Sequence, residues 1–174
     1  MNETQGRRSL DQIRILAIDP GSRTTGWAQL VGNTLLLNGN LKLPGSKDEA
    51  KTYTTLNYFI RQQLEGMMVN PGLVLKPNYI VLESFFTGRM RGTTVIPELR
   101  GVIKLAAYQV GGVKVVNVAP GTVKKYVTGS GRASKNEVRA AICKKFNISI
   151  KSHDEADAIA IGLTGLSRIV DMEI

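Results

Sequence analysis

The sequence has 174 residues, 43% hydrophobic and 21% charged, which excludes a largely disordered chain and favours one globular domain. It carries 23 Lys and Arg against 14 Asp and Glu, a formal net charge of +9. The single cysteine, Cys143, excludes an intrachain disulfide, and no uncharged apolar run approaches the roughly 18 residues of a membrane-spanning helix.

The beginning of the chain predicts three strands. Residues 13–18 are short and rich in β-branched side chains, and Asp19-Pro20-Gly21 closes them with a turn. Two more strands are expected over 26–31 and 34–43, joined by Gly32-Asn33 as a hairpin turn. The three strands are therefore expected to pair in an antiparallel arrangement.

The rest of the chain predicts an alternation of helices and strands. Apolar residues at helical spacing indicate a helix over 48–69, and Tyr79–Leu82 reads as a buried strand that ends at Glu83. Residues 87–94 are polar, basic and rich in glycine, which is typical of a loop. The remaining elements expected are a helix over 96–110, a strand over 113–118, and helices over 120–128, 134–146 and 152–170. This order favours a mixed sheet with helices, in the α/β or α+β class.

The positive charge is concentrated in the middle of the chain. Residues 85–151 hold 13 Lys and Arg against Glu98 and Glu137, a balance of +11, while the rest holds 10 basic and 12 acidic residues. A concentrated basic surface attracts polyanions, nucleic acid first. The alternative is a solvated face that aids solubility.

Four acidic residues stand where structure alone does not require them. Asp19 and Glu83 each end a predicted strand, where α/β proteins place their chemistry. Asp154 and Asp157 are three residues apart and share one helix face. Asp19 also suits a turn, Glu83 a solvated strand end, and Asp154 the capping box Ser152-x-x-Glu155. Asp157 lies among small apolar residues, where an unpaired carboxylate is costly.

The four carboxylates and the basic surface together indicate a Mg²⁺ site that acts on nucleic acid. Hard cations take oxygen ligands, and Mg²⁺ uses few protein ligands besides water and substrate phosphate. Two such ions about 4 Å apart activate water and stabilise the leaving oxygen of a phosphodiester. The basic surface supplies affinity for the DNA or RNA backbone, so one function explains both features.

Four blocks of the sequence resemble the RuvC family of Holliday-junction resolvases. They are residues 15–28 (ILAIDPGSRTTGWA), 81–86 (VLESFF), 124–135 (KKYVTGSGRASK) and 154–160 (DEADAIA), in the family's order. The resemblance implies an α/β, RNase H-like fold with a mixed five-stranded sheet flanked by helices. It also implies a flexible N-terminus over 1–12 and a single nuclease domain over 13–174.

The resemblance implies a role for each matching residue. Asp19, Glu83, Asp154 and Asp157 match the family's catalytic, metal-binding carboxylates, which hold two Mg²⁺ ions or Mn²⁺ in their place. Lys124, which we count as catalytic, and Lys135 match lysines near the scissile phosphate and the DNA backbone. Phe86 matches an aromatic residue that stacks on bases at the junction centre. The alternative for Phe85 and Phe86 is core packing, and because alternate residues of a strand face opposite ways, Phe86 is favoured as the exposed one. Further DNA contacts are expected from Arg89, Arg91, Lys125 and Arg132.

The implied enzyme is a homodimer that makes paired symmetric nicks in a four-way DNA junction, in recombination and repair. It is expected to be cytoplasmic and nucleoid-associated, in a bacterium or encoded by a phage, with no membrane partner. The sequence identifies no junction-migration helicase as a partner. His153 departs from the family pattern: it suits a metal ligand or general base, or an exposed or capping neighbour of Asp154.

The sequence alone leaves other functions open. Looser cleavage of flaps and forks competes with strict junction resolution. An actin-like ATP-binding domain has a hairpin similar to Asp19-Pro20-Gly21-Ser22 but needs about twice this length. A non-catalytic nucleic-acid binder on the same scaffold predicts the loss of at least one carboxylate, and all four are present.

Overall fold

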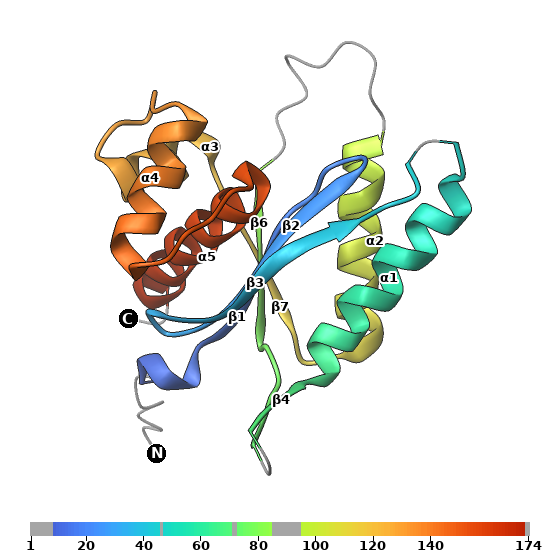
Figure 1. The fold of residues 1–174 in the computed structure, drawn as a ribbon. Helices are drawn as coiled ribbons and strands as arrows, with labels where there is room; N and C mark the ends of the chain where they lie inside the picture. The colour runs from blue at the N-terminus through green and yellow to red at the C-terminus, as the bar shows by residue number, and fades with distance from the viewer. Residues whose placement is uncertain (1–8, 46, 71–72, 85–94, 173–174) are drawn as a thin grey trace, which may run out of the picture.

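The computed structural model describes residues 9–45, 47–70, 73–84 and 95–172. A mixed five-stranded sheet, in the order β3-β2-β1-β6-β7, runs through the middle of the molecule (Figure 1). Its strands are β1 (Arg14–Asp19), β2 (Thr24–Val31), β3 (Thr34–Lys42), β6 (Tyr79–Glu83) and β7 (Lys114–Val118). Strands β1, β2 and β3 are antiparallel neighbours, whereas β6 and β7 run parallel to β1. The mixed sheet expected from the sequence is confirmed.

Helices cover both faces of this sheet (Figure 1). One face carries α1 (Glu49–Glu65) and α2 (Val95–Val110), and the other carries α3 (Pro120–Thr128), α4 (Lys135–Phe146) and α5 (His153–Met172). A short 3-10 helix, η1 (Leu10–Gln12), precedes β1. Among the residues that the structure describes, no helix has the length and apolar character needed to cross a membrane.

Alternating side chains of the strands divide the interior into two hydrophobic cores. Ala17 and Val81 belong to the core beneath α5, whereas Ile18 and Leu82 belong to the core beneath α1 and α2. Successive side chains of a strand point to opposite faces. The last residues of β1 and β6, which are Asp19 and Glu83, therefore fall on the α5 face.

Helix α5 lies directly on the sheet through two glycines. A Cβ at Gly162 would lie 2.5 Å from Leu30 Cδ1 and 2.9 Å from Ala17 Cβ. A Cβ at Gly165 would lie 2.5 Å from Val81 Cγ1. All three distances are shorter than van der Waals contact, so a side chain at either position would displace the helix. This close packing fixes the height of α5 over β1 and β6, and with it the position of its first turn.

The helix predicted over 48–69 ends earlier than expected. Helix α1 stops at Glu65, and Gly66 follows with a φ of 110°, a conformation that other residues rarely adopt. The chain then forms the antiparallel hairpin of β4 (Met67–Asn70) and β5 (Leu73–Leu75). The apolar spacing that continues to residue 67 therefore belongs to a strand, and the helix prediction is wrong beyond Glu65.

Candidate active site

Asp19 and Glu83 end two neighbouring parallel strands. The register pairs Ile18 with Leu82, so the two acidic residues follow at the same level and on the same face of the sheet. Burial, aided by the negative charges of Asp157 and Glu83, raises the pKa of Asp19 to about 7. Burial and the charge of Asp157 also raise the pKa of Glu83. In the absence of a cation, Asp19 therefore keeps its proton up to about neutral pH.

A close approach between β2 and α5 brings Asp154 to the same end of the sheet. Asp19 is paired with Gly26 across the β1–β2 ladder. A Cβ at Gly26 would overlap the main-chain carbonyl oxygen of Asp154, so a glycine is required there. The start of α5 thus rests on the residue opposite Asp19, and Asp157 follows one helical turn later, on the face that it shares with Asp154.

Strand β3, at the edge of the sheet, fixes the start of α5 through side-chain hydrogen bonds. The Asn38 amide donates to the carboxylate of Glu155. The Ser152 hydroxyl donates to Oδ1 of Asn40 at 3.2 Å and accepts the Glu155 N–H at 3.4 Å. Of the predicted capping box, the bond from the Glu155 N–H to the Ser152 hydroxyl is present. The Glu155 carboxylate accepts from Asn38 of β3 instead of completing the box. These bonds set the direction in which the first turn presents its aspartates.

Lys135, the first residue of α4, faces both aspartates of α5. Its Nζ lies 3.2 Å from Asp157 Oδ2 and 3.9 Å from Asp154 Oδ1. Burial lowers the pKa of Lys135, but the charge and hydrogen bond of Asp157, together with Asp19 and Asp154, raise it overall. The lysine side chain remains 60% exposed, so its ammonium group is open to an incoming ligand.

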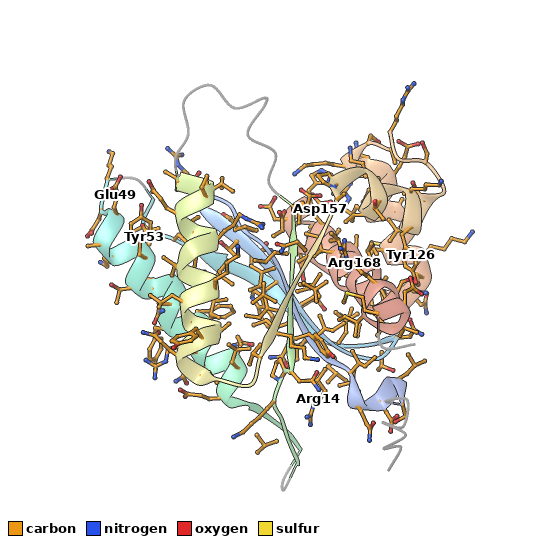
Figure 2. The ribbon with its side chains drawn as sticks, turned by 180° about the vertical axis from the view of Figure 1, so that it is seen from behind. Arg14, Glu49, Tyr53, Tyr126, Asp157 and Arg168 are labelled. Atoms are coloured by element: carbon orange, nitrogen blue, oxygen red, sulfur yellow. The ribbon has the colours of Figure 1, made fainter. Side chains whose placement is uncertain are left out.

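Asp157, labelled in Figure 2, interacts electrostatically with Lys135 and with every other carboxylate of the site whose pKa is shifted. Its side chain is 21% exposed, against 38% for Asp154. Burial raises the pKa of Asp157, Lys135 opposes the shift and Asp154 adds to it. The charge of Asp157 also acts on Asp19, Glu83 and Lys135, so a substitution at Asp157 would change the pKa of all three.

Arg100 supports the site and was not anticipated as a site residue. It is 9% exposed, and its guanidinium donates to the main-chain carbonyl of Glu83 and, at 2.7 Å, to Oδ1 of Asn117. Burial lowers the pKa of Arg100 and the charge of Glu83 opposes that shift. The side chain ties α2 to the ends of β6 and β7. The basic surface expected from the sequence therefore excludes Arg100, which lies inside the molecule.

Of the other predicted DNA-binding residues, Lys124 acts electrostatically on the acidic cluster, Lys125 and Arg132 share its face of the sheet, and the rest lie outside the described residues. Lys124 on α3 is half-buried, and its charge opposes the upward pKa shift of Glu83. Lys125 and Arg132 are exposed on the same side of the sheet, in α3 and just after it. Phe85, Phe86, Arg89 and Arg91 lie outside the described residues, so their roles stay predictions.

His153, the first residue of α5, is half-buried. Its Nδ1 is buried and finds no hydrogen-bond partner among the described residues. Its charge lowers the pKa of Asp157, which places the imidazole within the electrostatic reach of the site. The histidine is therefore less exposed than a simple flanking residue would be, and a catalytic or metal-binding role for it stays a prediction.

The chemistry of the four carboxylates suits a hard divalent cation. Burial and mutual repulsion raise the pKa of Asp19, Glu83 and Asp157, and a bound cation would relieve that repulsion. Within the described ranges, no three acidic or histidine side chains already stand in the geometry of metal ligands. The ammonium of Lys135 instead balances part of the negative charge. The predicted metal ligands therefore stay a prediction that the donor chemistry supports.

Proteins of one family are similar to this chain along most of its length. A sequence profile described as crossover junction endodeoxyribonuclease RuvC matches residues 15–165. A relative of that name from Prochlorococcus marinus is 32% identical over 90% of this chain and 98% of its own length. Another, from Nitrobacter hamburgensis, is 35% identical over 87% of this chain and 88% of its own length.

Solved structures share the fold. Thermus thermophilus RuvC superposes with a TM-score of 0.70 at 22% identity, covering 90% of this chain and 96% of that one. The same protein in complex with a Holliday junction substrate gives a TM-score of 0.71 at 20% identity, with the same coverage. The RNase H-like fold and the family resemblance expected from the sequence are confirmed. Because the profile spans most of the chain and full-length relatives exceed 30% identity, this chain belongs to the RuvC family of crossover junction endodeoxyribonucleases.

Proposed function

We propose that this chain is a metal-dependent, structure-selective endodeoxyribonuclease that resolves four-way DNA junctions. The observation that carries the proposal is the acidic cluster at one end of the sheet, where burial and the charge of Asp157 raise the pKa of Asp19 to about 7. Lys135 lies 3.2 Å from Asp157 and remains open to solvent. The related T. thermophilus RuvC was solved in complex with a Holliday junction, which supports this class of substrate.

The proposed reaction is hydrolysis of a phosphodiester bond. A water oxygen bonds to phosphorus, and the bond from phosphorus to the leaving sugar oxygen breaks. Mg²⁺, two ions in our proposal and replaceable by Mn²⁺, polarises the water and the leaving oxygen when bound. Asp19, Glu83, Asp154 and Asp157 would hold the ions. Asp19 binds a cation only in its ionised form, and cation binding lowers its pKa, so metal affinity falls as the pH drops below neutral.

The basic side chains on the α3–α4 side act on the negative charge of the substrate. Lys135, whose ammonium is solvent-open beside Asp157, stabilises charge that develops on the attacked phosphate. Lys124, whose charge reaches Glu83, holds the neighbouring backbone. The exposed Lys125 and Arg132 extend this contact along the DNA. Stacking by Phe86 on an unpaired base at the junction centre completes the proposed recognition.

Paired symmetric nicks need two active sites, so the proposed enzyme is a homodimer that matches the two-fold symmetry of the junction. The exposed face of α2 favours a contact between copies. Gly101, Leu105 and Tyr108 share that face at helical spacing, and Tyr108 is 85% exposed. A Cβ at Gly101 would meet nothing within 4 Å, which leaves room for a second helix to approach. This face lies across the sheet from the α3–α4 side (Figure 1). A contact through it would leave the proposed DNA-binding surface of each copy free.

Looser cleavage of flaps and forks is the alternative within the same chemistry. Membership of the RuvC family argues against an actin-like ATP-binding domain, and the presence of all four carboxylates argues against a non-catalytic binder. Acting on bacterial or phage DNA, the enzyme would work in the cytoplasm at the nucleoid.

The proposed substrate class is tested by comparing DNA structures of matched sequence. With Mg²⁺, the purified chain is expected to cut a synthetic four-way junction symmetrically and to leave linear duplex intact. In chelator it is expected to cut neither substrate. Flaps and forks cut as fast as the junction would favour the looser nuclease. Equal cutting of linear duplex would contradict junction selectivity altogether.

The proposed site is tested by Asp157→Asn, with Asp171→Asn as its control. Asp171 is an exposed aspartate in the last turn of the same helix. Asp157→Asn is expected to abolish cleavage, by at least about 100-fold, while junction binding persists, because it removes a proposed metal ligand and a negative charge that faces DNA. Asp171→Asn is expected to cut at the unaltered rate. Normal cleavage by Asp157→Asn would show that the metal site is wrongly assigned.

A further inference from the structure

A basic cleft lies at the end of the sheet opposite the acidic cluster. The parallel strands β1 and β6 end in Asp19 and Glu83 of that cluster, while Arg14, Asn78 and Lys114 stand at or just before the amino ends of β1, β6 and β7. Arg14 and Asp157 lie toward opposite ends of the sheet in Figure 2. The six residues of β1 separate Arg14 from Asp19 by about 16 Å.

The cleft consists of two adjoining cavities of about 340 and 510 Å³. Both are lined by Arg14, Asn78 and Gly112. Lys114 lines the smaller cavity, and Arg61 and Lys76, from α1 and from the residues before β6, line the larger one. The cleft thus collects four cationic side chains from four separate segments of the chain.

The charge of this cleft is positive after its acidic neighbours are counted. Glu65 is its only lining carboxylate in the described residues, and it lies 3.6 Å from Arg61. Glu65 and Val110 also mark the carboxyl ends of α1 and α2, which contribute about half a negative charge each. The balance of four cations, one carboxylate and two helix ends is about +2. A cleft of this charge favours an anionic ligand.

The floor of the cleft is held rigidly, and it contains a donor without a partner. The side chain of Asn78 accepts the main-chain N–H of Arg14 at 2.8 Å and donates to the main-chain carbonyl of Gln12 at 2.8 Å. The main-chain carbonyl of Asn78 accepts the main-chain N–H of Lys114 at 3.0 Å. Nε of Arg14 is buried and finds no hydrogen-bond partner within the described residues. A buried guanidinium N–H without a partner is costly, which points to a ligand that accepts it.

We infer that this cleft binds a phosphate group, at a site distinct from the proposed nuclease centre. A guanidinium presents a planar fork of donors that matches phosphate oxygens, and Lys114 adds an ammonium on the same wall. The phosphate belongs either to the backbone of a DNA arm or to a small phosphorylated molecule. Both sources share the chemistry that the cleft recognises.

The site is tested by titrating inorganic pyrophosphate into the metal-free chain and following backbone amide shifts by NMR. Shifts are expected to cluster at Arg14, Asn78, Gly112 and Lys114, beyond those caused by chloride at equal ionic strength. Arg14→Gln and, separately, the exposed Lys76→Gln are expected to weaken binding about tenfold and about threefold. Lys51→Gln, which removes an exposed charge at the far end of α1, is expected to leave it unchanged.

The source of the phosphate is distinguished by junction binding in Asp157→Asn, which serves as a cleavage-deficient background. If a DNA arm fills the cleft, adding Lys76→Gln lowers the dependence of log affinity on log salt by about one. If the slope is unchanged while pyrophosphate binding is weakened, the ligand is a small phosphate. Pyrophosphate shifts no larger than those of chloride, or shifts confined to α3 and α4, would overturn the inference, whatever the outcome of the cleavage assays.

Discussion

Asp19 shows how a single buried carboxyl links the chemistry of this protein to its stability. Its pKa is raised to about 7 by burial, Asp157 and Glu83, whereas in the unfolded chain it titrates near 3.8. Between these two values the folded chain binds the extra proton, so its stability relative to the unfolded chain falls as the pH rises. The stability contributed by protonated Asp19 is complete below about pH 4 and lost above about pH 7. The contribution of Asp19 to the stability of the metal-free chain is therefore smallest where the carboxylate is ready for a cation.

Asp19→Asn is expected to stabilise the metal-free chain at pH 8 by on the order of 2 kcal/mol, because the amide removes the buried negative charge. Near pH 4 most of the difference should disappear, since the folded carboxyl is then protonated and only about half of the unfolded carboxyl is ionised. Thermal unfolding at the two pH values, in chelator, measures this effect. Asp171→Asn, on the exposed end of α5, should change neither value, and an equal gain at pH 4 and pH 8 would refute the electrostatic cause.

Some residues of the site could be predicted from the sequence and others could not. Asp19 and Glu83 could be predicted because each directly follows a run of apolar strand residues, at the strand ends where α/β proteins place their chemistry. Arg100 could not, because a basic residue in an amphipathic helix usually faces solvent. Its burial depends on Asn117 and on the carbonyl of Glu83, each 17 positions away. Such a partnership exists only once α2 has been packed across β6 and β7.

At the scale of elements, α5 is the part of the fold that sets the geometry of the site. Its two glycines bring it against Ala17, Leu30 and Val81, and its first turn rests on Gly26. The aspartates of α5 are placed by backbone contact with β2 and side-chain bonds to β3, with no dependence on a long loop. A shift of this helix would move both aspartates relative to Asp19 and Glu83 together.

Gly162→Ala is expected to destabilise the chain by about 1–3 kcal/mol, because its Cβ would lie 2.5 Å from Leu30 and 2.9 Å from Ala17. The displaced helix should also lower the cleavage rate. Gly121→Ala in α3 is the matched control: its Cβ would meet nothing within 4 Å, so stability should be unchanged or slightly increased. Denaturant unfolding of both variants measures the difference, and equal stabilities would show that the helix–sheet contact tolerates a methyl group.

The elements were predictable where the apolar periodicity agreed with the residues that begin and end an element, such as proline and glycine. Pro120 at the start of α3 and Gly129 after its end bound that helix, as expected from the sequence. The β4–β5 hairpin was missed because Met67 continues the helical apolar spacing of α1. The decisive signal was Gly66, whose φ of 110° ends the helix, but a lone glycine in a sequence does not reveal its backbone angle.

At the scale of the whole molecule, the proposed DNA surface lies on the face of the sheet that α3, α4 and α5 cover. The exposed Lys125 and Arg132 lie on the α3–α4 side of this face. Arg132→Gln is expected to weaken junction binding and reduce its salt slope by about one, because one phosphate contact is lost. Arg168→Gln, an exposed charge in the second half of α5, should leave the slope unaltered. Fluorescence anisotropy over a range of salt concentrations measures both, and equal slopes would remove Arg132 from the DNA surface.

The proposed homodimer is tested at the same scale. Leu105→Glu combined with Tyr108→Glu is expected to shift the chain from dimer to monomer in sedimentation equilibrium, because two charges would be buried at the α2 contact. Tyr126→Glu, an exposed tyrosine on the opposite face of the sheet, is the matched control and should remain a dimer. A dimer that survives the double change would place the contact elsewhere.

The division of the interior into two separate cores has a consequence for how this protein can change over evolutionary time. Substitutions beneath α1 and α2 and substitutions beneath α5 share few neighbours, because the backbone of the sheet stands between them. Their effects on stability should therefore be close to additive. The α1–α2 layer, which carries the proposed contact between copies, can therefore accept substitutions with little effect on the stability of the α5 layer. The exception is Arg100, because it donates a hydrogen bond to the carbonyl of Glu83.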